Sequence, residues 1–134
     1  MYDYPQMVHE SPEFQPNPPA GKEALSALRM ALPRPLPNSY MAFLERANGG
    51  ERFIGQRYAQ LWRAEDLIEF NRGYKVSEFA PNLFLIGSDG GGEAYAFDIS
   101  TNDPTLFEVP FIGMPELLRP VAPSFDSFVA FLYT

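Results

Sequence analysis

The sequence predicts an α+β fold in a single domain, and three observations support this prediction. The chain has 134 residues, the size of one domain, and 46% of them are hydrophobic, which is enough to build a core. Apolar residues recur with helical spacing towards both ends of the chain, whereas short apolar runs separated by turn residues fill its middle. Helices that flank a series of hairpin-linked strands are typical of an α+β domain.

The first 20 residues are predicted to form an extended, proline-rich tail. They contain five of the fourteen prolines, three acidic residues, the only histidine, and no lysine or arginine. Proline disfavours helix interiors and sheet ladders. We therefore divide the chain into a tail over residues 1–20 and an α+β domain over residues 21–134. Removing residues 1–16 is expected to leave the stability nearly unchanged.

Two helices are predicted to follow this tail. The first begins at Lys22, has its apolar residues near one face, and ends at a run of alternate prolines. The second lies within Leu36–Gly50, with Asn38 or Ser39 as its N-cap. Asn48-Gly49-Gly50 is expected to end it, because glycine adopts the left-handed conformation of a helix C-cap without a steric penalty.

The middle of the chain alternates between strand and helix patterns. Two short strands are expected at Arg52–Ile54 and Tyr58–Trp62, separated by a glycine turn. Trp62–Tyr74 has a helical pattern, in which Asn71 is expected to hydrogen-bond backbone groups of a neighbouring loop. The continuous apolar run Leu83–Ile86 is too short for a helix and predicts a central strand.

The last third predicts a hairpin, a further strand and a terminal helix. Gly87–Gly92 forms the turn before a strand at Glu93–Ile99, whose alternation places aromatic residues on one face and alanines on the other. Another strand is expected at Thr105–Val109, followed by a proline-punctuated loop. The final helix, Ser124–Tyr133, has a serine N-cap and a buried apolar face.

Composition and charge exclude several classes of function. The absence of cysteine excludes disulfides, thiolate metal sites and cysteine nucleophiles, and it favours a cytoplasmic location. No apolar stretch approaches the length of a membrane span, so we expect no membrane partner. A formal charge of −7 disfavours nucleic acid and favours a cationic partner.

Catalytic patterns are weak. His9 lies in the predicted tail and cannot be held beside a nucleophile, and no G-x-S-x-G motif exists. An alternative is that the protein is a small hydrolase in which Asp89, Glu93 and Asp98 form a carboxylate- or metal-dependent active site. The D-x-D-x-D-G pattern of a calcium loop is missing, and we expect neither a cofactor nor a metal.

The glycine-rich stretch Gly87–Glu93 has two interpretations. Such loops cradle phosphates when they open a helix, but here no Lys-Ser or Lys-Thr follows, a strand pattern comes next, and the two acids would repel a phosphate. A hairpin turn explains the glycines more simply. The turn also displays Asp89 and Glu93, which could serve a basic partner.

Several motifs together resemble the SUKH superfamily, which includes the fungal cell-wall-synthesis regulator of the Smi/Knr type and many bacterial proteins. They are LPNSYMAFLERANGG from Leu36, then Trp62, LIEFN with Tyr74, LFLIGSDGGGEAYAFD from Leu83, and SFDSFVAFLY near the end. The resemblance implies a twisted, mainly antiparallel sheet packed with helices. It also implies a role, because bacterial members are thought to be immunity proteins that neutralise a toxin, often a nuclease. The proline-rich tail departs from this pattern, and the fungal regulator's signalling role is not implied.

These observations predict a non-enzymatic binding protein, an immunity protein that occludes the active surface of a basic toxin domain. The candidate partner-binding residues are Glu51, Trp62, Asp89, Glu93 and Tyr95. As the only tryptophan, Trp62 could be either an interface anchor or part of the core. Besides the hydrolase, a regulatory scaffold whose proline-rich tail is bound by another domain remains an alternative.

Overall fold

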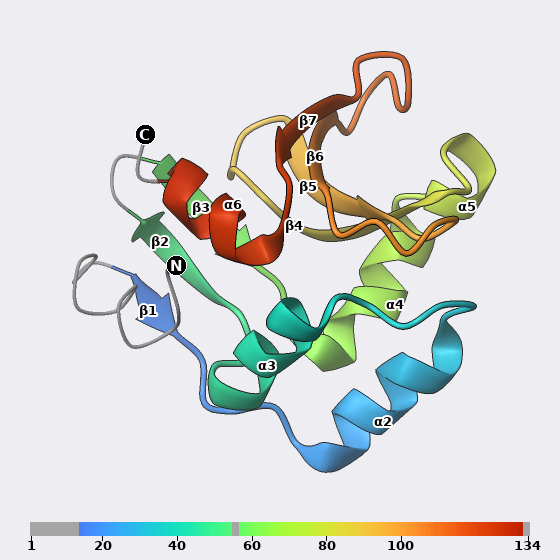
Figure 1. Cartoon of the computed structure of the whole chain (residues 1–134). Coiled ribbons are helices and arrows are strands. Elements are labelled where there is room, and N and C mark those ends of the chain that lie inside the picture. The colour runs from blue at the N-terminus through green and yellow to red at the C-terminus, as the bar shows by residue number, and fades with distance from the viewer. Residues whose placement is uncertain (1–13, 55–56, 133–134) are drawn as a thin grey trace.

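One antiparallel sheet organises the chain, and helices pack on both of its faces (Figure 1). The computed structural model describes residues 14–54 and 57–132. In this part of the chain seven strands pair in sequence order from β1 to β7, and every neighbouring pair is antiparallel. The predicted α+β class and the mainly antiparallel sheet are confirmed.

The first three strands form one half of the sheet. They are β1 (Gln15–Pro16), β2 (Gly50–Ile54) and β3 (Arg57–Leu61). The hairpin of β2 and β3 was predicted; β2 is two residues longer than expected, and β3 is shifted by one residue towards the N-terminus. β3 connects to the second half through only two residue pairs, Gln60 with Ser88 and Leu61 with Gly87. The two halves are therefore joined by a short ladder.

The second half contains the most buried strands. It consists of β4 (Leu83–Ser88), β5 (Glu93–Asp98), β6 (Leu106–Pro110) and β7 (Arg119–Ala122). The first three confirm the predicted strands. β7 was expected to be loop, because its sequence RPVA contains a proline. It is the last strand of the sheet, and an edge strand tolerates proline because one of its sides needs no ladder hydrogen bonds.

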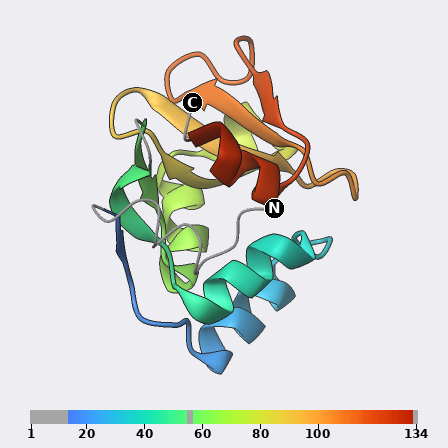
Figure 2. The same cartoon turned by 60° about the vertical axis from the view of Figure 1, so that its left-hand side comes forward.

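Five helices accompany the sheet in the described residues: α2 (Lys22–Ala31), α3 (Asn38–Arg46), α4 (Ala64–Gly73), α5 (Val76–Phe79) and α6 (Phe125–Leu132). Residues of α2, α3, α4 and α6 join one face of the sheet in the larger core cluster. α5 contributes to a smaller cluster on the other face. In Figure 2, α2 and α3 lie below the sheet and α6 lies across it.

Alternation along β5 separates the two clusters. Tyr95 and Phe97 belong to the larger cluster, whereas Ala94 and Ala96 belong to the smaller one with Val76 of α5. Small side chains on this face allow close packing of the short helix, as the alternation predicted. The sheet therefore has one aromatic face and one face of small residues.

Asn71 on α4 satisfies the backbone of β4 where β3 no longer pairs with this buried strand. Its side-chain oxygen accepts the Leu85 N–H at 2.8 Å, and its amide nitrogen donates to the Leu85 carbonyl at 3.0 Å. The expectation that this side chain satisfies backbone groups is confirmed, although those groups belong to a strand rather than to a loop.

The predicted tail differs from the structure in its last residues. Phe14 is 3% exposed and belongs to the larger core cluster, and β1 pairs with β2. Asn17 and Ala20 also donate backbone hydrogen bonds, to Gly49 and Leu44 respectively. The remainder of the predicted tail, residues 1–13, lies outside the described residues. Residues 14–20 are therefore integrated with the fold, because an aromatic side chain and a short ladder attach them to it.

The helix caps of α3 also differ from the prediction. Its N-cap is Pro37, without a side-chain hydrogen bond, so neither Asn38 nor Ser39 has the expected role. Its C-cap is the extended residue Ala47, so the following glycines do not end the helix. In contrast, Ser124 accepts the Ser127 N–H at 3.2 Å and caps α6 as predicted.

Gly49 and Gly50 are required by close backbone contacts at the start of β2. Gly49 has φ of +77°, and a Cβ there would lie 2.1 Å from the Leu61 carbonyl oxygen. At Gly50 a Cβ would lie 2.6 Å from the Gln15 carbonyl oxygen. Backbone atoms of β1 and β3 occupy the space that a side chain would need, so these positions exclude side chains for steric reasons.

We predict that Gly49→Ala lowers the free energy of unfolding by more than about 1 kcal/mol, because a positive φ and a backbone clash coincide there. Gly73→Ala is the matched control, since nothing lies within 4 Å of a Cβ at this helical glycine. Chemical denaturation measures both variants. Equal stability of the two would contradict the proposed steric role.

We also predict that Phe14→Ala lowers the free energy of unfolding by about 3 kcal/mol or more, as expected for the loss of a fully buried aromatic ring. This replaces the expectation that residues 1–16 are dispensable. The neighbouring exposed variant Gln15→Ala is the control, and thermal denaturation is the measurement. A Phe14→Ala protein with unchanged melting temperature would restore the earlier expectation.

Candidate protein-interaction surface

Four aromatic side chains form a partly exposed row, which we call the aromatic ladder: Phe70, Trp62, Tyr74 and Phe111. Trp62 contacts Phe70 edge to face with ring centroids 5.0 Å apart, and it is nearly parallel to Tyr74 at 6.1 Å. Tyr74 stacks on Phe111 at 4.4 Å. Phe70 is 37% exposed and Tyr74 45% exposed. The ladder therefore offers a preorganised aromatic surface to solvent.

The elements that support the ladder are anchored by backbone hydrogen bonds. Trp62 follows β3, and its N–H donates to the Ile86 carbonyl at 3.0 Å. Phe70 and Tyr74 lie four residues apart and therefore on the same side of α4 and its C-cap. Phe111 follows β6, and its N–H donates to Gly92 in the β4–β5 turn at 2.9 Å. Three separate segments thus converge in one row.

Trp62 packs on the core and also borders the candidate surface, and its role as an interface anchor stays a prediction. It is half-buried and packs against both core clusters. It also lies between the exposed rings of the ladder. A single side chain therefore links the core to the candidate surface.

Beside the ladder is a groove of about 500 Å³, which we call the polar groove. A row of paired residues crosses its floor, because Glu51 of β2 pairs with Gln15 of β1 on one side and with Gln60 of β3 on the other. Its full lining is Gln15, Pro16, Asn17, Gly50, Glu51, Gln60, Leu61, Trp62, Arg63, Asp66 and Phe70. Trp62 and Phe70 thus belong to both features, which form one continuous surface.

Glu51 is exposed in this groove, as the sequence prediction of a partner-binding residue requires. One of its carboxylate oxygens accepts the Tyr58 hydroxyl at 2.6 Å, and this hydrogen bond raises the pKa of Tyr58. Among the described residues, neither Glu51 nor Asp66 forms an ion pair. Neither charge is therefore balanced by an ion pair in this part of the chain, although one Glu51 oxygen is already bonded to Tyr58.

Asn48 positions α4, which carries half of the ladder. Its side-chain oxygen accepts the Ala64 N–H at 2.7 Å, so a residue 16 positions away satisfies a free amide at the helix N-terminus. Its amide nitrogen donates to Glu65 at 2.6 Å, and this bond is the main reason that the pKa of Glu65 is lowered. The charge of Arg63 lowers the pKa of Glu65 further.

Asp89 and Glu93 have structural partners. An Asp89 oxygen accepts the N–H groups of Gly91 at 2.8 Å and Glu93 at 3.2 Å, which closes the β4–β5 turn. Glu93 accepts a hydrogen bond from Arg119 at 2.7 Å, and Arg119 also pairs with Glu108. The hairpin interpretation of the glycine-rich stretch agrees with this geometry. The role of these two acids in partner binding remains a hypothesis.

Tyr95 does not lie on the surface. It is 1% exposed and packs edge to face on Phe128 of α6 at 4.8 Å. Burial is the main cause of its raised pKa. A partner could not contact this ring in the conformation described, because α6 covers the aromatic face of the sheet.

The carboxylates of the hydrolase alternative do not converge. Glu93 and Asp98 begin and end β5, so they are separated by roughly 17 Å of extended strand. Asp98 accepts hydrogen bonds from the N–H and the hydroxyl of Ser100. Within the described residues no group of three metal-ligating side chains is found.

No helix in the same part of the chain is long and apolar enough to cross a membrane.

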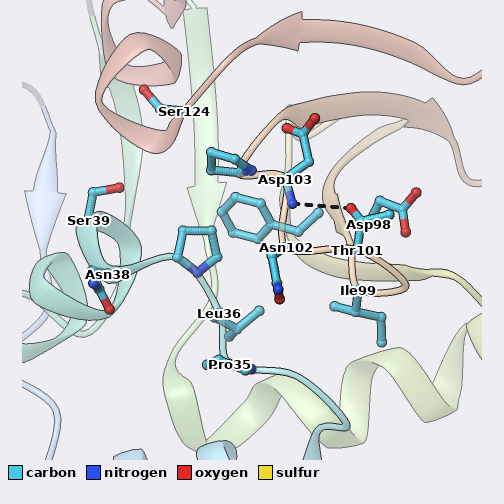
Figure 3. A pocket seen from close by; sticks show the side chains of 13 residues that line it. Pro35, Leu36, Asn38, Ser39, Asp98, Ile99, Thr101, Asn102, Asp103 and Ser124 are labelled. Carbon is cyan, nitrogen blue, oxygen red and sulfur yellow. Dashed lines mark hydrogen bonds between the residues drawn. The ribbon is translucent and has the colours of Figure 1, made fainter.

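A second hollow, of about 400 Å³, lies where the chain enters α3 and α6 (Figure 3). The β5–β6 loop forms its opposite wall, with Asn102 and Asp103 in the view. Asp103 already accepts hydrogen bonds from Thr105, which lower its pKa. The acids of this loop thus organise its turns, and the hollow has no paired acid and base.

Comparison with known families agrees with this architecture. The profile of the SMI1/KNR4 family (SUKH-1) matches residues 19–130. The chain belongs to this family. No curated protein matches it closely enough to count as a relative. The SUKH resemblance inferred from the sequence motifs is therefore confirmed.

The sequence analysis of this SUKH-1 chain did not predict several residues of this surface, namely Gln60, Asp66, Phe70, Tyr74 and Phe111. Phe70 and Asp66 lie in a helix that was predicted, and their residue types suit a binding surface. Helical periodicity gave no indication, however, that they lie near β2. Phe111 was assigned to a loop, and its proximity to Tyr74 depends on the register of β6 with β5. The pairing of strands that are distant in the sequence therefore determines which of these side chains lie side by side.

We predict that the stability difference between this SUKH-1 protein and its Asn48→Ala variant depends on pH. At neutral pH the free energy of unfolding of the variant should be lower by about 2 kcal/mol, because the Ala64 N–H and the Glu65 carboxylate lose their partner. The pKa of Glu65 is lowered in the folded protein. Its contribution to stability is therefore complete above the ordinary pKa of 4.5 and is lost as the pH falls through the pKa of the folded state.

The difference should therefore become smaller below pH 4.5. Denaturation measured across the acidic range tests this expectation. Glu65→Gln is the control, since it keeps an acceptor for Asn48 but cannot titrate. A difference that stays constant with pH would contradict the assignment to Glu65.

Proposed function

We propose that this protein is a non-enzymatic immunity protein that binds a toxin and occludes its active surface. Family membership is compatible with this role, because SUKH proteins are generally immunity or regulatory proteins without enzymatic activity. We propose that it acts in the cytoplasm of the cell that it protects.

The observation that carries the proposal is the exposure of the aromatic ladder. Interface hot spots are enriched in tryptophan and tyrosine, particularly where neighbouring residues exclude water around them. Phe70 and Tyr74 expose a substantial part of their rings, yet they are held in place by contacts with Trp62 and Phe111. A rigid aromatic surface loses little conformational entropy on binding, which favours tight association.

The charge of the protein supports a basic partner. The formal charge is −7, and Glu51 and Asp66 beside the ladder have no ion-pair partner among the described residues. Acidic residues at the rim of an interface accelerate the encounter with a basic partner, whereas buried aromatic anchors slow dissociation. Occlusion of this kind needs no chemical step.

The proposal is tested by capturing the partner from the producing cell with tagged protein. The captured protein should inhibit growth when it is expressed alone, and co-expression of the SUKH-1 protein should restore growth. A partner that does not inhibit growth, or growth that is not restored, would argue for a regulatory role instead.

We predict that Phe70→Ala combined with Tyr74→Ala lowers affinity for this toxin by about 30-fold or more, as expected for hot-spot side chains. Surface plasmon resonance measures the effect. Phe79→Ala is the matched control, because Phe79 is an exposed aromatic residue outside the ladder. Equal affinities of the double variant and the control would place the interface elsewhere.

A further inference from the structure

The polar groove combines two features that recognise a guanidinium group. Trp62 and Phe70 provide aromatic rings, and Glu51 and Asp66 provide carboxylates in the same lining. Arginine stacks on aromatic rings and forms charge-assisted hydrogen bonds with carboxylates, so both kinds of contact can be made at once.

We infer that the polar groove binds an arginine side chain of the partner protein. The inference rests on the proposed function, and it adds the chemical identity of an anchor residue and the place that receives it. The guanidinium would lie between the Glu51 and Asp66 carboxylates, with the aromatic pair along one wall.

The size of the groove agrees with this occupant. A volume of about 500 Å³ is ample for one long side chain together with the backbone that carries it. Gln15, Asn17 and Gln60 supply further hydrogen-bonding groups around the carboxylates. They can pair with the peptide groups that flank the arginine.

Among the described residues that line the groove, Arg63 is the one basic residue, and its charge opposes this occupant. Its charge also acts on the neighbouring Glu65, where it helps to lower the pKa of that carboxyl. Two carboxylates are set against one guanidinium, so the lining formed by the described residues has a net negative charge.

A short, capped peptide that contains one arginine tests the inference directly. Trp62 is the only tryptophan, so its fluorescence reports on the groove without a label. Peptides with lysine or with uncharged citrulline in place of arginine are the comparison probes, at constant ionic strength. We expect the arginine peptide to change Trp62 emission saturably and to bind about fivefold or more tightly than the lysine peptide.

Two variants then locate the site. Glu51→Gln with Asp66→Asn should weaken binding of the arginine peptide by about tenfold or more, because both carboxylate contacts are lost. Glu23→Gln with Glu116→Gln has the same change in charge outside the groove and should leave the affinity unchanged. Melting temperatures of both double variants show that each is folded.

Three results would overturn the inference. They are no saturable response to the arginine peptide, equal binding of the citrulline peptide, and equal weakening by the control variant. None of these would affect the proposed function, since protection from the toxin is measured separately. Conversely, a groove that binds arginine in a protein that protects against no toxin would refute the immunity role alone.

Discussion

The structure depends on the junction at Asn48, where four polar groups of one residue are all satisfied. Its N–H donates to Pro18, and its carbonyl accepts a hydrogen bond from the side chain of Asn17. Its side chain joins Ala64 and Glu65 at the start of α4. A buried amide without partners costs about 1 to 3 kcal/mol, so this arrangement strongly constrains the segments around it.

The glycines beside Asn48 extend this constraint into the sheet. Gly49 lies against the Leu61 backbone, and Gly50 lies against Phe14 and Gln15. The junction therefore brings β1, β2, β3 and α4 together. Because Trp62 directly follows β3 and α4 begins two residues later, the position of the aromatic ladder depends on this local packing.

Five acidic residues considered as candidates for a site have different surroundings. Asp89 and Asp98 organise turns, and Glu93 pairs with Arg119. These three residues stabilise local structure, whereas Glu51 and Asp66 line the polar groove, where Glu51 accepts one hydrogen bond from Tyr58 and neither acid forms an ion pair with a described residue. Net charge alone therefore favoured a cationic partner, but it did not identify the residues that we propose to contact it.

The sequence by itself determined the elements whose signals are local. Helical periodicity predicted α2, the Ser124 cap and α6, and strict alternation predicted β5 with its aromatic and alanine faces. Only the tertiary structure decided the roles of Phe14, Asn48 and Tyr95. Phe14 lies in a proline-rich segment, and the contacts that bury it come from β2 and the larger core cluster. Asn48 caps a helix that begins 16 residues later, and Tyr95 is covered by α6. The physical reason is the same in each case. Burial and polar pairing depend on residues that are distant in the sequence, whereas periodicity reports only on near neighbours.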